Sequence, residues 1–101
     1  MKSLEEIPAQ PTARDPHLSA WIEHWKNPTA AFQGKPFWCW NGKLTEEELL
    51  RQLPIFKEMG MGGVFMHSRT GLATEYLGDE WFHLVNTCAD EAEKLGMEAW
   101  L

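Results

Sequence analysis

The sequence lacks the features that would place it in a membrane or on nucleic acid. No apolar run approaches the ~20 residues that cross a bilayer, and residues 1–6 lack the apolar core of a signal peptide. The chain has 9 Lys and Arg against 15 Asp and Glu, and its basic residues are spread out rather than clustered. We therefore expect a cytoplasmic protein with no nucleic acid partner and no membrane partner.

Cysteine is also scarce, and no motif for a metal or a nucleotide is present. Cys39 and Cys88 belong to no CxxC pattern and to no metal-ligand spacing, so we expect both to be reduced, buried and inert. The glycine-rich stretch 60–63 precedes a predicted strand instead of opening a helix, which excludes a phosphate-binding loop. The sequence thus predicts no metal and no cofactor.

Tryptophan is the one residue in excess, with 6 among 101 residues. Such a surplus indicates either a large core or a face that stacks on flat ligands.

Residues 1–34 are expected to form an N-terminal arm with one short helix. The polar stretch 1–14 has no periodicity, whereas Asp15 can cap a helix that Pro16 begins and that Asn27-Pro28 ends. Its apolar face contains Leu18, Trp21, Ile22 and Trp25.

Residues 35–101 repeat one pattern, in which a short apolar strand is followed by a loop, a capped helix and a glycine. The first strand spans 36–40, and the helix after it has a capping box of Thr45 and Glu48 and a glycine stop at Gly60. Leu49, Leu50, Leu53 and Phe56 form its apolar stripe. Pro54 lies inside this helix, where we expect a kink near Leu50 rather than two helices.

The second strand spans 62–67 and is apolar on both faces, as in parallel sheets covered by helices. A polar loop then covers 68–78, and Asp79 is expected to cap a helix that ends at Gly96. A third strand begins at 97–101 without a following turn. Strands separated by helices predict a parallel α/β sheet, and the unfinished third strand suggests a fragment of a larger domain.

Ligands of parallel α/β proteins bind at the carboxyl ends of the strands. At the first strand, the indole of Trp40 could stack on a sugar ring, and the amide of Asn41 could bond two hydroxyls. Because Trp38 and Trp40 alternate onto one side of the strand, both could instead pack the core.

At the second strand, His67 could exchange a proton or bond a hydroxyl, and Arg69 could pair with a carboxylate. The alternatives are a histidine that caps the loop and an arginine in a structural ion pair.

Three segments carry a resemblance to a known family, and they are PFWCWNG at 36–42, EMGMGGVFMHSR at 58–69 and EAEKLGMEAWL at 91–101. They resemble the start of the catalytic domain of large bacterial glycoside-hydrolase-like proteins of the α-L-rhamnosidase type. The similarity covers about residues 27–101.

This resemblance implies a (β/α)8 barrel (TIM barrel), of which residues 35–101 would hold three strands and two helices. It implies a carbohydrate substrate, acid and base carboxylates on later strands, and sugar contacts by Trp40, Asn41, His67 and Arg69. Pro54 departs from the family pattern. The partner would be the remainder of the barrel, without which we expect no hydrolysis.

Two other functions remain open from the residues. One is a self-contained carbohydrate-binding module that uses its tryptophans for stacking, and the other is an interaction fragment that becomes ordered with a partner chain.

Overall fold

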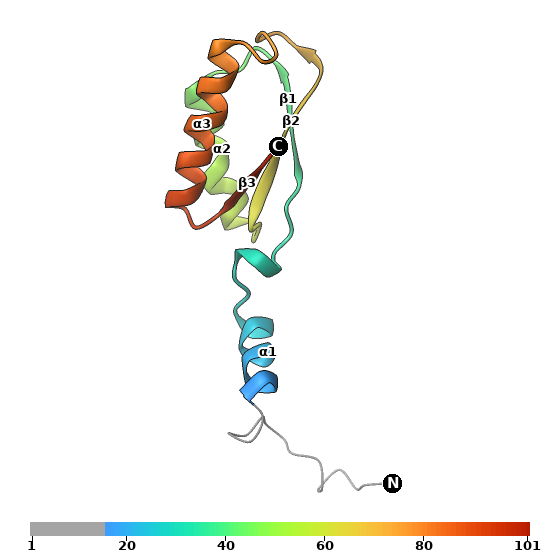
Figure 1. Ribbon diagram of the computed structural model, residues 1–101, viewed down its shortest axis with the longest axis vertical. Helices are drawn as coiled ribbons and strands as arrows, with labels where there is room; N and C mark the ends of the chain where they lie inside the picture. Colours follow the sequence, from blue (N-terminus) through green and yellow to red (C-terminus); the bar gives the residue numbers. More distant parts are fainter. Residues whose placement is uncertain (1–15) are drawn as a thin grey trace, which may run out of the picture.

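The computed structural model describes residues 16–101 as an α/β unit preceded by a separate helical segment (Figure 1). The elements in chain order are α1 (Pro16–Lys26), the 3₁₀ turn η2 (Ala30–Phe32), β1 (Phe37–Gly42), α2 (Glu46–Glu58), β2 (Gly63–Leu72), α3 (Asp79–Lys94) and β3 (Glu98–Trp100). No helix in this described part is long and apolar enough to span a membrane. The predicted cap Asp15 lies outside the described residues.

The three strands form one sheet in the order β1-β2-β3, and both pairs are parallel. Phe37 aligns with Phe65, and Phe65 aligns in turn with Trp100. Helices α2 and α3 lie side by side against one face of this sheet (Figure 1). The predicted α/β class with parallel strands joined by helices is therefore confirmed.

The core fills the space between the sheet and these two helices. Alternate residues of β1 and β2 point into it, because successive strand residues face opposite sides. The core includes Trp38, Trp40, Leu44, Leu49, Leu53, Val64, Met66, Trp81, Leu84, Val85, Cys88, Ala92 and Met97. Burial of these side chains supplies the main favourable term in folding, at about 25 cal/mol per Å² of apolar surface.

Helix α2 begins and ends as the sequence predicts. Thr45 Oγ1 accepts a hydrogen bond from the Glu48 backbone N–H at 3.4 Å, which is one half of the expected capping box. The Glu48 carboxylate bonds Arg51 and Gln52 instead of returning to the cap. The helix runs through Pro54 without a break, and Gly60 with φ 87° follows its end.

The ends of the first two strands and the cap of α3 differ from the prediction. Strand β1, expected to end at residue 40, continues to Gly42. The polar segment expected to be a loop from residue 68 continues β2 as far as Leu72, because β1 extends to Gly42 and pairs with it past a bulge. The N-cap of α3 is Gly78, not Asp79. Asp79 is the first helical residue, where its negative charge still favours the positive end of the helix dipole.

The face of the sheet away from the helices is open, which corrects two expectations. Strand β2 is not buried on both faces, since His67 and Arg69 are exposed and Phe65 is only half-buried. Cys39 is also exposed, because it alternates with the buried Trp38 and Trp40. Cys88 is buried as predicted, and burial, with a smaller contribution from the Glu46 charge, raises the pKa of its thiol to about 12.

Gly62 and Gly63, at the start of β2, allow close packing at the amino ends of the strands. A Cβ at Gly62 would lie 2.4 Å from the Ala30 carbonyl oxygen, and one at Gly63 would lie 2.4 Å from the Glu98 oxygen. Lys35 and Glu98 form an ion pair of 2.8 Å at the same end. The amino ends of the strands are therefore closely packed; that this end is structural stays a prediction.

Helix α1 lies apart from the sheet, beyond the amino ends of the strands (Figure 1). Its predicted apolar face is mostly exposed, with Trp21 at 72% and Trp25 at 88% of their full accessible surface. The helix therefore forms with the expected bounds but does not contribute to the core.

Candidate functional site

The carboxyl ends of β1 and β2 lie beside each other, so the predicted site residues come from neighbouring strands. Cys39 aligns with His67 and Trp40 aligns with Ser68 in the parallel register. Asn41 follows on β1, and Arg69 follows on β2. Parallel pairing thus places the four predicted residues at neighbouring levels of the two strands, while β2 continues beyond them to Leu72.

Trp40 differs from the other three because its side chain points toward the helices. It is 1% exposed, with its ring 5.6 Å from that of Trp38 and 6.5 Å from that of Trp81. Its Nε1 has no hydrogen-bond partner among the described residues. Its indole therefore belongs to the core described above, and a sugar contact by Trp40 stays a prediction.

His67 and Arg69 lie on the helix-free face together with Cys39. The ring of His67 is 5.3 Å from that of Phe37, and Arg69 Nη1 donates to Cys39 Sγ at 3.1 Å. Within residues 16–101, Arg69 forms no ion pair with a carboxylate. Its guanidinium therefore retains donors for a ligand or for a carboxylate from elsewhere.

Asn41 is placed by a bulge at the end of β1. The register shifts between Trp40 and Gly42, and Gly42 has φ 66°, a conformation that favours glycine. Bulges of this kind redirect a side chain at the end of a strand. Asn41 is exposed. A Cβ added at Gly71 would lie 3.8 Å from the Cβ of Asn41, so the end of β2 runs close beside Asn41.

The loop between β2 and α3 adds residues that the sequence prediction did not select. Glu75 and Tyr76 line a cavity of about 580 Å³ together with Arg69 and Thr70. The signal in the sequence is an acidic residue beside an aromatic one in a loop that follows a strand, and this pattern is common in solvated loops. Only the folded loop brings these residues to the same hollow as Arg69.

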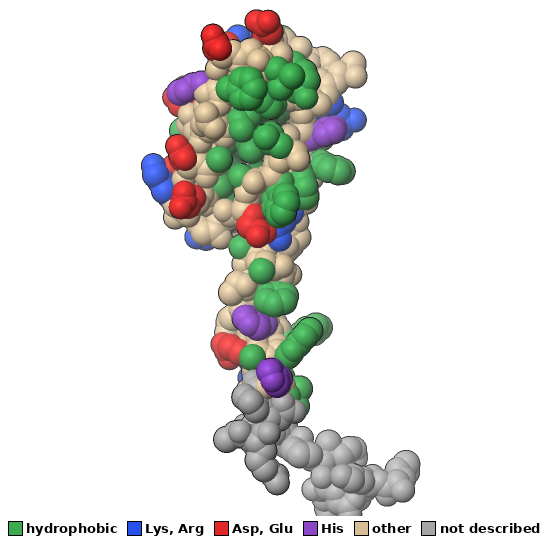
Figure 2. All heavy atoms as spheres, viewed as in Figure 1, with side chains coloured by type: hydrophobic (Ala, Val, Ile, Leu, Met, Phe, Trp, Pro, Cys, Tyr) green, Lys and Arg blue, Asp and Glu red, His purple; other side chains and the backbone are tan. Residues whose placement is uncertain are grey.

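A second cavity of about 390 Å³ lies at the carboxyl end of β3 and also reaches Tyr76. Its wall includes the exposed side chains of Leu77, Phe82 and Leu101. Figure 2 shows hydrophobic side chains gathered in this region beside α3, with acidic side chains at the margin. Most of its lining is apolar, but His67 and Ser68 also line it, so this cavity reaches one of the predicted site residues.

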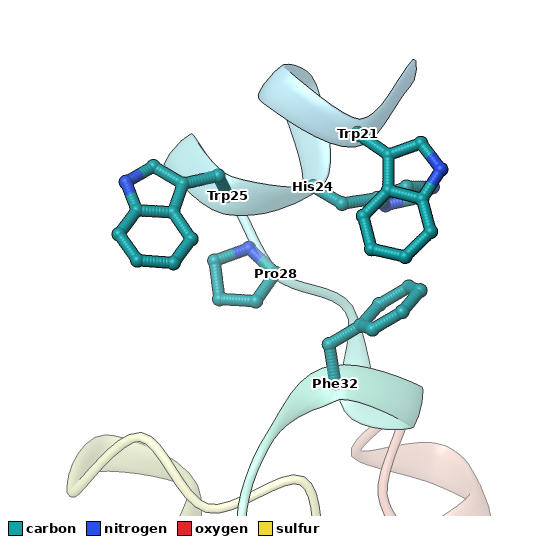
Figure 3. A pocket seen from close by; sticks show the side chains of 5 residues that line it. All are labelled: Trp21, His24, Trp25, Pro28 and Phe32. Atoms are coloured by element: carbon teal, nitrogen blue, oxygen red, sulfur yellow. The ribbon is translucent and has the colours of Figure 1, made fainter. Parts of the chain in front are cut away.

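An aromatic hollow of about 370 Å³ lies in the helical segment formed by α1 and η2 (Figure 3). In Figure 3, Trp21 lies above Phe32 at the right of the hollow, and Trp25 and Pro28 lie to the left of these two rings. The rings of His24 and Phe32 are 4.7 Å apart. The hollow holds no acid or base besides His24, so its walls are suited to contact rather than to catalysis.

Ionisable groups with displaced pKa values lie away from the strand ends. Hydrogen bonds from Arg51 and Gln52 lower the pKa of Glu48 to about 2 on the exposed side of α2. The residues that the structure describes contain no group of three or more His, Cys, Asp or Glu side chains that could hold a metal ion. The site therefore offers hydrogen-bond donors and acceptors, an aromatic ring and one histidine.

No protein-family model matches this chain, and no curated protein matches it either.

Proposed function

We propose that this chain supplies the first three strands of a (β/α)8 barrel in a glycoside hydrolase that acts on plant or microbial glycans. In such a barrel the helices cover the outside and the inner face of the sheet encloses the core. The arrangement of α2 and α3 on one face, with the other face open, supports this proposal.

The observation that supports the proposal is that Asn41, His67 and Arg69 lie on neighbouring parallel strands, with Asn41 next to the last residue of β1 and Arg69 bonded across to Cys39 on that strand. Active sites of barrel enzymes lie at the carboxyl ends of the strands. An amide, an imidazole and a guanidinium together donate and accept hydrogen bonds as a sugar with several hydroxyls requires. Their role is to hold and orient the carbohydrate.

Hydrolysis of a glycosidic bond requires two carboxyl groups on opposite sides of that bond, one of which protonates the leaving oxygen. The strand ends of β1 and β2 present no carboxylate next to His67 and Arg69. In this proposal the remainder of the barrel supplies both groups, and the 101-residue chain alone does not hydrolyse glycosides.

The experiment compares this chain with a longer version that includes whatever the reading frame encodes after Leu101. We expect the longer protein to hydrolyse an aryl glycoside, and its His67→Ala variant to lose about ten- to a hundredfold in kcat/KM. His83→Ala is the matched control, because His83 is exposed on α3 and pairs with Glu46. Hydrolysis by the 101-residue chain at enzyme-like rates would refute the proposal, and so would a stop codon after Leu101.

A second candidate function is a carbohydrate-binding or interaction module that uses tryptophan stacking. The exposed Trp21 and Trp25 of α1 favour it, since solvent-exposed indoles are enriched at binding surfaces. Saturable binding of oligosaccharides by the 101-residue chain that is lost in Trp25→Ala, but kept in His67→Ala, would support this function over the hydrolase.

A further inference from the structure

The end of β2 and the loop between β2 and α3 border an open hollow with the volume of a ligand site. Its volume of about 580 Å³ lies within the range of about 300–1,000 Å³ that small-molecule sites occupy. Residues 68–70 at the end of β2 form one wall, and residues 72–76 form the rest. We call this space the loop hollow.

Tyr76 places an aromatic ring at the loop hollow. Its side chain is 61% exposed, and its ring meets that of the buried Trp81 edge to face, with 5.3 Å between centroids. Such a contact occupies at most one face of the tyrosine ring. Trp81 is itself held by a hydrogen bond of 2.9 Å from its Nε1 to Ser68 Oγ, so Tyr76 rests on a fixed support.

The backbone on either side of Tyr76 is also constrained. The Gly78 N–H donates to the Glu75 carbonyl at 3.1 Å, and Leu77 between them has φ 62°. This is the pattern of a type II turn, in which glycine is favoured at the position of Leu77. A leucine there costs about 1–2 kcal/mol, and because Leu77 is exposed, burial does not offset this cost.

The other end of the loop is tied to the core. Thr74 is buried, and its Oγ1 accepts a hydrogen bond of 3.1 Å from the Leu44 backbone N–H. Together with the turn at Leu77, this bond keeps Tyr76 in place before a ligand arrives. A preorganised aromatic ring loses little conformational entropy on binding.

The charges that line the loop hollow are balanced. Arg69 contributes a guanidinium and Glu75 contributes a carboxylate, and the other lining residues are uncharged. Neither forms an ion pair within the described part of the chain. The hydroxyl groups of a neutral sugar can do both, because each accepts a hydrogen bond from a guanidinium and donates one to a carboxylate.

We infer that the loop hollow is a subsite for an uncharged pyranose ring, which stacks on Tyr76 while its hydroxyls bond Arg69 and Glu75. This inference rests on the proposed carbohydrate function and adds a stacking residue and a class of sugar to it. The ring of a neutral sugar has an apolar C–H face that matches the tyrosine, and hydroxyls at its rim that match the two charged side chains.

The test is a titration of the 101-residue chain with methyl glycosides of neutral pyranoses, followed by the backbone amide NMR signals of residues 68–78. Tyr76→Ala should weaken binding of the best neutral glycoside by about tenfold, because loss of an aromatic contact costs about 1 kcal/mol or more. Tyr76→Phe should bind as the parent does, since stacking needs no hydroxyl. Phe82→Ala is the matched control. Like Tyr76, Phe82 packs edge to face against Trp81, but it does not line the loop hollow.

Binding that survives Tyr76→Ala, or signal changes confined to residues outside 68–78, would overturn the subsite. Tighter binding of methyl glucuronide than of neutral glycosides would overturn the assignment to an uncharged sugar. The absence of binding by every glycoside would also refute the inference.

The same titration distinguishes a failure of the proposed function from a failure of this inference. If His67→Ala and Asn41→Ala leave binding unchanged while Tyr76→Ala abolishes it, the subsite stands and the sugar contacts at the strand ends do not. The opposite result would keep the proposed strand-end contacts and remove the subsite.

Discussion

The two faces of the sheet differ in what they contact, although both are rich in aromatic residues. Trp38 and Trp40 pack beneath α2 and α3 on one face, whereas Phe37, 71% exposed, lies on the other. On the open face, the ring of Phe65 is 5.7 Å from that of Phe37 and 5.8 Å from that of Trp100. Aromatic content therefore does not by itself indicate whether a strand face is covered, and only the placement of the helices decides it.

The largest difference between the faces should appear in thiol chemistry. With iodoacetamide at pH 8, Cys39 on the open face should be alkylated in the native chain, and Cys88 should react orders of magnitude more slowly. With a pKa of about 12, on the order of one Cys88 thiol in ten thousand is ionised at pH 8, and burial also blocks the reagent. Mass spectrometry of tryptic peptides measures both rates.

In this experiment Cys39→Ser should leave native labelling near zero, and urea should make Cys88 reactive. Equal labelling of the two cysteines in the native chain would show that the covered face is accessible.

Side-chain truncation on the covered side should cost the most stability. Leu53→Ala should lower the free energy of unfolding by about 2–5 kcal/mol, because it leaves a cavity in a close-packed core. Leu53 is fully buried, whereas Ile55 on the same helix is 40% exposed, so Ile55→Ala should cost much less. Urea denaturation followed by circular dichroism measures both, and equal losses would contradict the assignment of the core.

A smaller effect is expected where the backbone of β2 approaches β3. Gly63→Ala should destabilise the chain by about 1–3 kcal/mol, because the added Cβ would overlap the Glu98 carbonyl. Gly34→Ala is the control, since its Cβ would meet only Met61 Sδ at 3.7 Å. Thermal unfolding of the two variants tests this pairing, which would be in doubt if Gly63→Ala were as stable as Gly34→Ala.

The smallest effect concerns a charge outside both faces. The pKa of Glu48 is about 2 in the folded chain, below its usual value of 4.5, because Arg51 and Gln52 bond the carboxylate. A lowered pKa stabilises the fold at pH above 4.5, and this stabilisation is lost as the pH falls from 4.5 toward 2. Since Glu48 is exposed, the loss should be a small shift in the unfolding midpoint.

Glu48→Gln should remove this pH dependence, and Glu47→Gln should retain it, because Glu47 forms no ion pair with the described residues. A midpoint that shifts equally in the two variants would show that Arg51 does not stabilise the carboxylate.

Local signals predicted most of the secondary structure. They failed at the end of β2, where pairing with β1 extends the strand, and at the start of α3, where Gly78 takes the N-cap position expected for Asp79. Thr45 and Gly60 delimit α2 as expected, since capping and left-handed glycine act within one turn. Strand β2 runs past its predicted end because Gly42 on β1 pairs with Leu72. Nothing within residues 68–72 reveals that pairing.

The candidate site was predicted only in part, because its local residues could be read from the sequence but its long-range contacts could not. The two strands and their parallel order could be located from the sequence, and with them Asn41, His67 and Arg69, but the carboxyl end of β2 lies at Leu72, beyond its predicted end. The contact between Arg69 and Cys39, and the side of the strand to which Trp40 points, depend on the position of the helices. Tyr76 lacked a signal because a loop aromatic has no periodicity.

The alternation of parallel strands and helices, and the ends of the helices, follow from residues close together in the chain, because hydrogen bonding and capping are local. Which face of the sheet is covered, and which side chains meet at the loop hollow, follow only from packing between distant segments. Arg69 and Tyr76 line one hollow because of the path that the chain takes after β2 ends at Leu72, and Trp40 is buried in part because Trp81 of α3 packs against it. These contacts join residues that are far apart in the sequence, so no local pattern of residues predicts them.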